Sequence, residues 1–384
     1  MSALYTYDEG AIVALINEIY PSLRVRWAKA LPTAHIQRLY HIYRNTDNAP
    51  PLMVILPPPP EVRPLRCERD CVTAEATLLR WMNSNSSAGR HYLPTIYSFL
   101  PANVMDGRAA ILLTMPVHGY TLAELEDDDV LSEYDDYPLD WQAGQLLRRI
   151  ALHVSPSRKF GYIVDVLRET DAAQQQHLRP AVHPTELGFD TWSGAFGLML
   201  ESVLQDLEDH TVLVAYDRVR QHFRRFRPLL DRVTRPSLTS INAGEMANLV
   251  LEPDYNGQTG LNCRYRVAGL RDWSSCVFGD PLLSTKFTTA GPESEEFIRG
   301  VETCLEDDED DEDDGDPIVE DPAGVPARRA LYECYHSLVG IARQYHRPRR
   351  AGRLGEDMEM HWRRKQLDAM EKLNSFDDDG ILRS

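Results

Sequence analysis

One carboxylate in this sequence stands where a strand is expected to end. Residues 267–270 form a short, mostly apolar run, Asp272 follows as an exposed acid, and Gly279-Asp280-Pro281 makes a second turn soon afterwards. A strand-end carboxylate can hold a divalent metal ion beside a nucleotide, since hard cations prefer oxygen ligands. The same pattern is also typical of a strand that simply ends in two turns, so these residues alone leave both interpretations open.

The elements that must position Asp272 fall into two parts, and the first is a sheet. Residues 1–117 predict a small, mainly antiparallel sheet lobe, with helices at 9–19 and 69–82. Glu75 lies in the middle of the second helix. The expected strands lie in RVRWAKAL, IQRLYHIYR, PLMVIL, LPTIYSFL and AAILLTMPV. Four prolines end the third strand, because proline cannot continue a strand ladder.

The second part is larger and mainly helical. Residues 118–300 begin with a polar linker after Gly119, and helices are expected at 141–153, 196–210 and 212–230. Two short strands, in SINAGEMANLVLEP and CRYRVAGL, are joined around an Asn-Gly turn. Residues 301–326 are expected to form an acidic, disordered loop, and residues 327–384 the C-terminal helices and tail. The predicted fold class is therefore α+β, with a small antiparallel-sheet lobe and a larger helical lobe.

Four segments, in this order, resemble the aminoglycoside phosphotransferase and choline kinase-like family, in particular its fungal members. PPLMVILPPPPEVRPLRCERDCVTAEATLLRWM is similar to the family's third strand, proline run and Glu-bearing helix. AILLTMPVHGYTL resembles its hinge between lobes, and GQLLRRIALHVSPSRKFGYI its helix ending in His before a Phe-Gly turn. GLRDWSSCVFGDPLL resembles its metal-binding Asp segment. The resemblance covers roughly residues 20–290 and implies a two-lobed protein kinase-like fold.

The resemblance also implies roles for individual residues. Asp272 would hold the magnesium ion that bridges the ATP phosphates, and Asn248 would hold a second metal position, which makes both catalytic in an active enzyme. Glu75 and the hinge residues Met115 and Val117 would lie at the nucleotide. Asp280 would be structural and brace the turn beside the site.

The catalytic turn departs from the family pattern. Counting back from Asn248, SINAGEMAN places Ala243 where the family has the Asp that accepts the substrate hydroxyl proton. Alanine has no proton-accepting group. Glu245 is the nearby carboxylate that could act as a substitute base, and the alternative is a solvated turn residue.

The phosphate-binding parts depart as well. The third strand has Ile55 where a Lys or Arg would grip the phosphates, which leaves Glu75 without its expected partner. Arg63, Arg66 or Arg69 could swing in from the proline-rich loop. The first hairpin, ALPTAHIQ, contains no glycine to cover the phosphates, and its proline has no N–H to donate.

The charge balance excludes one class of partner and leaves two charged segments to explain. The 384 residues carry a formal net charge of −18, whereas a nucleic-acid binder needs a basic face. Much of the acidity is the run EDDEDDEDD at 306–314, expected to be solvated and alternatively a contact for a basic partner. The basic helix at 218–235 is expected to be a solvated face that balances this run, or else to carry an acidic ligand or partner.

Compartment and membrane association can also be predicted. No stretch approaches the roughly 18–20 apolar residues that cross a bilayer. The beginning MSALYTYDEG does not resemble a secretory signal. Six scattered cysteines favour reduced thiols over a metal site or disulfides. We therefore expect a cytoplasmic protein that does not bind membranes.

Three functional interpretations remain open. The first is a catalytically degenerate protein of the family, which binds a small molecule or a protein and binds Mg²⁺ and ATP weakly or not at all. The second is a working ATP- and magnesium-dependent small-molecule phosphotransferase that uses Asp272 and Asn248 with an unusual base, because a loose transition state tolerates a weak base. The third is an unrelated α+β scaffold with an accidental resemblance.

Overall fold

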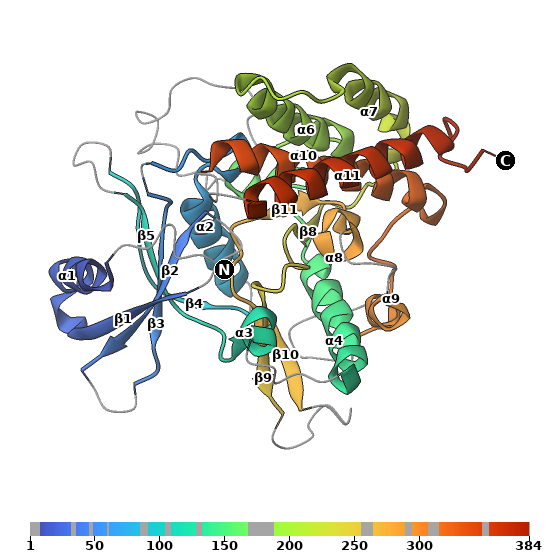
Figure 1. Cartoon of the computed structure of the whole chain (residues 1–384). Helices are drawn as coiled ribbons and strands as arrows, with labels where there is room; N and C mark the ends of the chain where they lie inside the picture. The colour runs from blue at the N-terminus through green and yellow to red at the C-terminus, as the bar shows by residue number, and fades with distance from the viewer. Residues whose placement is uncertain are drawn as a thin grey trace.

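The chain folds into a sheet lobe and a helical lobe that lie side by side (Figure 1). The computed structural model describes residues 8–31, 36–45, 49–59, 61–84, 91–103, 109–127, 133–167, 188–254, 264–288, 294–305, 315–347 and 353–383. The predicted turn at 32–35, most of the Asn-Gly loop and the acidic run 306–314 lie outside these residues.

The smaller lobe is a five-stranded antiparallel sheet in the order β1-β2-β3-β5-β4. Its strands are β1 (Val25–Leu31), β2 (Arg38–Arg44), β3 (Leu52–Leu56), β4 (Thr95–Leu100) and β5 (Ile111–Met115). Apolar residues of β2, β3 and β5 alternate between its two faces, because side chains of a strand point to opposite sides in turn. One face packs against α1 (Glu9–Ile19) and the other against α2 (Cys71–Ser84). Figure 1 shows α1 on the outer side of the sheet and α2 on the side of the larger lobe.

The larger lobe combines two small sheets with most of the helices. Its strands follow the orders β10-β9-β6 and β7-β11-β8. These strands are β6 (Tyr120–Thr121), β7 (Gly161–Tyr162), β8 (Ser237–Ser240), β9 (Leu249–Pro253), β10 (Tyr265–Leu270) and β11 (Cys276–Gly279). The helices are α3 (Leu122–Asp127), α4 (Glu133–Leu152), α5 (Ile163–Val166), α6 (Trp192–Asp209), α7 (Tyr216–Leu230), α8 (Thr285–Thr288), α9 (Glu295–Glu302), α10 (Val325–His346) and α11 (Arg353–Ser375). None of the helices in the described part of the chain is both long enough and apolar enough to cross a membrane.

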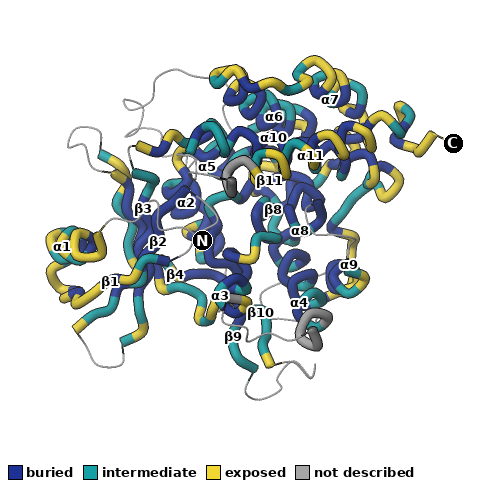
Figure 2. Tube along the Cα trace, viewed as in Figure 1, coloured by how far each residue is buried: buried dark blue, intermediate teal, exposed yellow. Residues whose placement is uncertain are grey.

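The main hydrophobic core lies in the larger lobe and extends under α2. Trp192, Phe196 and Trp273 are at its centre and are almost completely buried. Figure 2 shows the deep burial of α2, of α10 and of the strands of the small lobe, with the exposed surface concentrated on α1, α7 and α11. The residues between the lobes are therefore held by packed elements on both sides.

The predicted elements of the small lobe are confirmed, whereas parts of the larger lobe differ. The helix at 9–19 and all five strands are present. The predicted polar linker after Gly119 is wrong in its first part, because β6 and α3 form there. The helix predicted at 212–230 begins only at Tyr216, and α10 begins at Val325, within the region expected to be a loop. Strands β8 and β11 were not predicted, since four residues are too few to show a period.

Candidate functional site

Asn248 and Asp272 lie side by side at one end of the β9–β10 hairpin. Leu249 and Leu270 are register partners in this antiparallel pair, so the residues just before β9 and just after β10 must meet. The Asn248 Oδ1 atom accepts from the Asp272 backbone N–H at 2.8 Å, and Asn248 Nδ2 donates to the Asp272 carbonyl at 3.3 Å. Asn248 is 1% and Asp272 4% exposed. The expectation of an exposed acid at 272 is therefore wrong, because the hairpin end is covered by α2.

Glu75 of α2 reaches the same point from the small lobe. Its Oε1 atom accepts from the Trp273 backbone N–H at 3.2 Å, and its Oε2 atom accepts from Gln37 Nε2 at 3.2 Å. Glu75 thus has two hydrogen-bond partners that lie far from it in sequence, and neither is the Lys or Arg of the family pattern. Its complete burial, together with the nearby charge of Asp272, raises the pKa of Glu75 well above its ordinary value. The carboxyl group is therefore held by two neutral donors, in surroundings that favour its protonated form.

The strand position expected for a phosphate-gripping cation is apolar. Ile55 is completely buried in β3, and its register partners are Leu39 and Leu112. All three belong to the apolar layer between the sheet and α2. Burying this layer stabilises the small lobe, and it provides no charge for a phosphate group.

The hinge residues lie between the two lobes, at the end of β5. Met115 is 44% exposed and Val117 is partly buried. The chain then turns at Gly119, whose φ of +134° favours glycine, and Tyr120 pairs with Leu251 of β9. A Cβ atom at Gly119 would lie 2.2 Å from the Leu251 carbonyl oxygen, so the hinge is pressed against the larger lobe. Contact of Met115 and Val117 with a nucleotide stays a prediction.

The turn between β8 and β9 contains no proton acceptor at its central position. Ala243 is 5% exposed there. The preceding Asn242 accepts from the hydroxyl groups of Ser240 and Ser275, which hold the turn in place. Glu245 lies on the same turn, with its Oε1 atom 3.8 Å from Arg343 Nη1. Its carboxylate is thus engaged with α10, and its role as a substitute base stays a prediction.

Arg63 and Arg66, which precede α2, contact the larger lobe. Arg66 forms an ion pair with Asp206 and another with Asp209 at 3.0 Å, both in α6. Arg63 lies 3.7 Å from Asp209. Glu68 completes this clamp through ion pairs to Arg343 of α10 at 3.1 Å and to Arg347, which follows the helix. Arg66 is therefore engaged by carboxylates of α6, and movement of Arg63, Arg66 or Arg69 toward phosphates stays a prediction.

We expect Glu68→Ala to weaken this clamp measurably. Glu68 is 8% exposed, and its Oε2 atom also accepts from the Leu65 backbone N–H. Losing these charged hydrogen bonds should lower the free energy of unfolding by about 1.5–3 kcal/mol. We expect a value near the lower end, because Arg343 and Arg347 can exchange the lost carboxylate for water. Urea unfolding measures the difference. Glu208→Ala is the matched control, since Glu208 pairs with Arg220 while 43% of its side chain is exposed. Equal effects of the two changes would contradict the clamp.

Asp280 has the structural role expected for it. Its Oδ1 atom accepts from the Leu282 backbone N–H at 3.1 Å, which caps the turn after β11. Its Oδ2 atom accepts from Arg328 and, at 2.8 Å, from the Tyr332 hydroxyl. Tyr332 in turn accepts from Trp192 Nε1 at 2.7 Å. This buried network ties the segment after Asp272 to α10 and α6.

The charges of α7 are used within the molecule. Arg220 pairs with Glu201 and Glu208 of α6 at 2.6 and 2.9 Å. Arg225 pairs with Asp378 at 2.7 Å and donates to the Leu373 carbonyl. These contacts join α7 to its neighbours, so part of the predicted solvated basic face is an internal packing surface.

The residues predicted to hold Mg²⁺ do not fit it as they are arranged. The Asn248 amide oxygen is engaged by the backbone N–H of Asp272. Within the described ranges, no three His, Cys, Asp or Glu side chains are grouped so that they could hold a metal ion. Mg²⁺ demands near-octahedral oxygen ligands. Asp272 and Asn248 would have to separate to provide them, and metal binding by this pair stays a prediction.

Several residues at this site were missed by sequence reasoning. Gln37 contacts Glu75, and Arg271, directly before Asp272, pairs with Glu124 of α3 at 2.7 Å. Each pair joins residues far apart in the chain, so it has no counterpart in local sequence.

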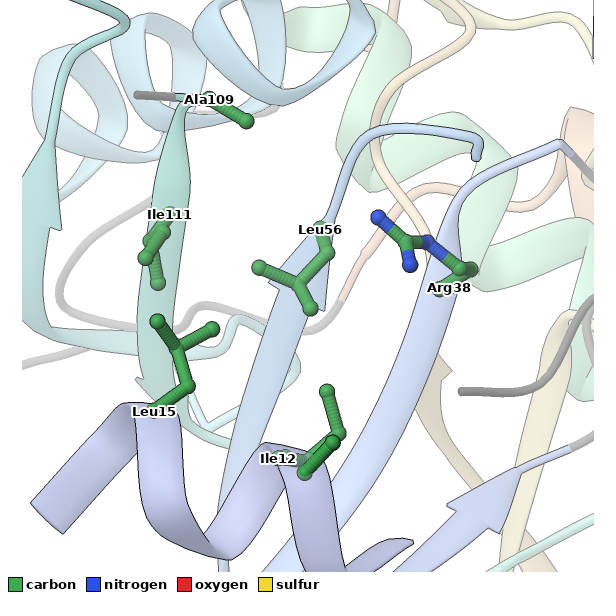
Figure 3. Close-up of a pocket in the computed structure, with 7 residues that line it drawn as sticks. Ile12, Leu15, Arg38, Leu56, Ala109 and Ile111 are labelled. Carbon is green, nitrogen blue, oxygen red and sulfur yellow. The ribbon is translucent and has the colours of Figure 1, made fainter. Parts of the chain in front are cut away.

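A separate pocket lies on the far face of the small sheet (Figure 3). It has a volume of about 370 Å³ and is lined by Ala11, Ile12, Leu15, Arg38, Leu56, Ala109 and Ile111. None of the predicted site residues lines it. Because α1 and α2 cover opposite faces of the sheet, this pocket is separated from Glu75 by the sheet itself.

Comparisons with known proteins identify the fold. No family model and no curated protein matches the sequence. Among solved structures, a putative fructosamine-3-kinase from Thermobifida fusca YX-ER1 is similar with a TM-score of 0.56 and 14% identity, over 95% of this chain and 98% of that one. The GDP complex of wild-type aminoglycoside 2′-phosphotransferase-IIIa is similar with a TM-score of 0.53 and 14% identity, over 96% and 100%. Aminoglycoside phosphotransferase APH(4)-Ia gives 0.51 and 11%, over 95% and 99%. The chain therefore has the two-lobed, kinase-like α+β fold of these phosphotransferases, and identities this low show the fold alone.

Proposed function

We propose that this protein is a catalytically degenerate member of the aminoglycoside phosphotransferase-like kinase fold, which acts by binding a small molecule or a protein partner between its lobes. The observation that carries the proposal is the state of Glu75. Its partners are Gln37 and the Trp273 N–H, and burial together with the nearby charge of Asp272 raises its pKa. A phosphoryl-transfer site of this fold instead uses the Glu as an anion paired with the phosphate-gripping Lys.

Two further features of the site support the same proposal. Ala243 stands at the centre of the turn where a base would accept the hydroxyl proton, and it is buried. Ile55 fills the strand position of the cation with apolar packing. Phosphoryl transfer depends almost entirely on positioned charges, so the loss of both should lower the rate by orders of magnitude. Weak or absent binding of Mg²⁺ and ATP follows from the proposal. The scattered cysteines favour a reducing compartment, and we propose the cytoplasm.

An active Mg-ATP-dependent small-molecule phosphotransferase is the second candidate. Its specific support is the position of Asn248 beside Asp272, where the side-chain amide contacts the Asp272 backbone N–H and carbonyl. A rotation of the Asn248 side chain would turn its oxygen away from the Asp272 N–H.

An assay of the full chain with millimolar Mg-ATP tests the proposal. We expect release of ADP at the buffer background rate and a melting temperature that barely changes. A ligand that did bind, at 100 times its Kd, would instead add about 2.7 kcal/mol to the free energy of unfolding. The variant Asp272→Asn should show the same background. Turnover by the wild type that falls at least 100-fold in Asp272→Asn would overturn the proposal and establish the active enzyme.

A further inference from the structure

The pocket on the α1 side of the small sheet has no part in the proposed function. Its floor is formed by Ile12 of α1, Leu56 of β3 and Ile111 of β5, each at most 3% exposed. Ala11 and Ala109 also line it and are exposed, so they lie at its rim. Figure 3 shows the lining side chains of α1 pointing toward the strands across one open space. The pocket is therefore apolar at its floor and open to solvent at its rim.

This pocket lies where the apolar face of α1 meets one end of the sheet. The face includes Ile12 and Ile16, which are buried, and continues to Leu15, which is only partly buried. Arg38 begins β2 and Leu56 ends β3, and the two are register partners at this end of the sheet. The helix and the strands enclose a volume of about 370 Å³. Pockets that bind small molecules have volumes of about 300–1,000 Å³ and mainly apolar walls with few polar groups.

Arg38 is the charged residue of the pocket wall. It is 8% exposed, and its Nε atom donates to the Pro57 carbonyl at 2.7 Å, which fixes the guanidinium group at the pocket. Figure 3 shows this group beside Leu56. The other lining residues are Ala, Ile or Leu. A planar guanidinium packs well against the face of an aromatic ring, so this wall suits a flat apolar molecule.

The charges around the pocket favour a ligand that carries no charge. Asp8 caps the start of α1, and Glu9 accepts from the Ala30 backbone N–H, so two carboxylates lie within one helical turn of Ala11. An anion would be repelled by these carboxylates, and a cation would be repelled by Arg38. A charge of either sign would also lose its hydration among the apolar side chains.

We propose that this pocket binds an uncharged aromatic molecule of two or three rings. The rings lie on the floor of Ile12, Leu56 and Ile111, and the Arg38 guanidinium packs against them. Water finds few polar partners in such a space, so an apolar ligand displaces it readily. The site is additional to the one between the lobes, because the sheet separates it from Glu75.

Two fluorescent probes with the same rings test the ligand class on the full chain. Phenylnaphthylamine is uncharged, and anilinonaphthalenesulfonate adds one sulfonate group to the same ring system. We expect one phenylnaphthylamine molecule to bind to each chain, with a rise in its emission as it leaves water. The sulfonate should bind at least tenfold more weakly, because its charge would have to be buried. Tighter binding of the sulfonate would overturn the assignment to uncharged ligands.

Matched variants locate the probe in the pocket. Ala11→Phe fills the rim from α1 and should weaken phenylnaphthylamine binding at least tenfold. Ala14→Phe makes the same change at an exposed position of α1 that does not line the pocket, and it should leave the affinity unchanged. Ala109→Phe fills the rim from the segment before β5 and should repeat the effect of Ala11→Phe. Equal affinities of the Ala11 and Ala14 variants, or no binding by the wild type, would overturn the site.

Two other occupants would give different results. Residues 1–7 precede Asp8, and probe binding that appears only after their removal would assign the pocket to this segment. A second copy of the chain would compete with the probe, so the affinity would fall as the protein concentration rises. Either result would overturn the small-molecule site. ATP turnover would remove the proposed function and leave this site standing, because the two lie on opposite faces of the sheet.

Discussion

Replacement of Asp280 by alanine should lower the free energy of unfolding by about 3–5 kcal/mol, because it leaves a buried guanidinium without its carboxylate. The side chains of Asp280 and Arg328 are both completely buried, and Tyr332 and the Leu282 N–H donate to the same carboxylate. Burial by itself would lower the pKa of Arg328. The neighbouring charge of Asp280 outweighs burial and raises this pKa above its ordinary value. Urea unfolding followed by circular dichroism measures the loss.

The control for this change is an ion pair at the surface. Asp231 lies 3.9 Å from Arg227 on α7, with 37% and 61% of the respective side chains exposed. Asp231→Ala should change the free energy of unfolding by less than about 1 kcal/mol, as exposed pairs do. A cost below 1 kcal/mol for Asp280→Ala as well would mean that the buried network does not hold the turn after β11.

Replacement of Glu75 by glutamine should change the pH dependence of stability. The pKa of Glu75 is raised in the folded protein, so below its ordinary value of 4.5 both the folded and unfolded states are protonated and the group costs nothing. As the pH rises past 4.5, the unfolded chain releases the proton while the folded chain keeps it. Stability therefore falls until the pH reaches the folded pKa, at about 1.4 kcal/mol for each unit between the two values.

Glutamine is neutral at every pH, so Glu75→Gln removes this fall. Its oxygen can still accept from the Trp273 N–H, and its amide can donate to Gln37 Oε1, a buried atom with no hydrogen-bond partner among the described residues. We expect the melting temperatures of the variant and the wild type to agree at pH 4 and to separate as the pH rises above 4.5, with the variant higher. Glu18→Gln, an exposed change on α1, should show no such divergence. A variant that is less stable than the wild type at pH 8 would show that Glu75 is ionised in the folded state.

These two carboxyl groups illustrate different uses of burial. Asp280 is paired with Arg328, and it fixes the segment that follows the candidate site. Burial and the nearby charge of Asp272 raise the pKa of Glu75, against the two hydrogen bonds that it accepts from Gln37 and the Trp273 N–H. In a site built for phosphoryl transfer the second group would be paired with a cation. This difference supports the proposal of a scaffold that binds over one that transfers phosphate.

Much of the small lobe and part of the site could be predicted from local patterns. The alternation of apolar residues located five strands and the helix at 9–19, because periodicity records which face of an element is buried. The proximity of Asn248 to Asp272 was also accessible, since both flank strands of one hairpin.

Only the tertiary structure decided which partners the charged groups have and how deeply they are buried. Arg66 binds Asp206, and Glu75 binds Gln37 and Trp273, through contacts between residues far apart in the chain. The burial of Asp272 likewise follows from the packing of one lobe on the other. A periodic sequence determines the inward face of each element, but Coulomb interactions and desolvation depend on through-space distances that appear only when both lobes are assembled.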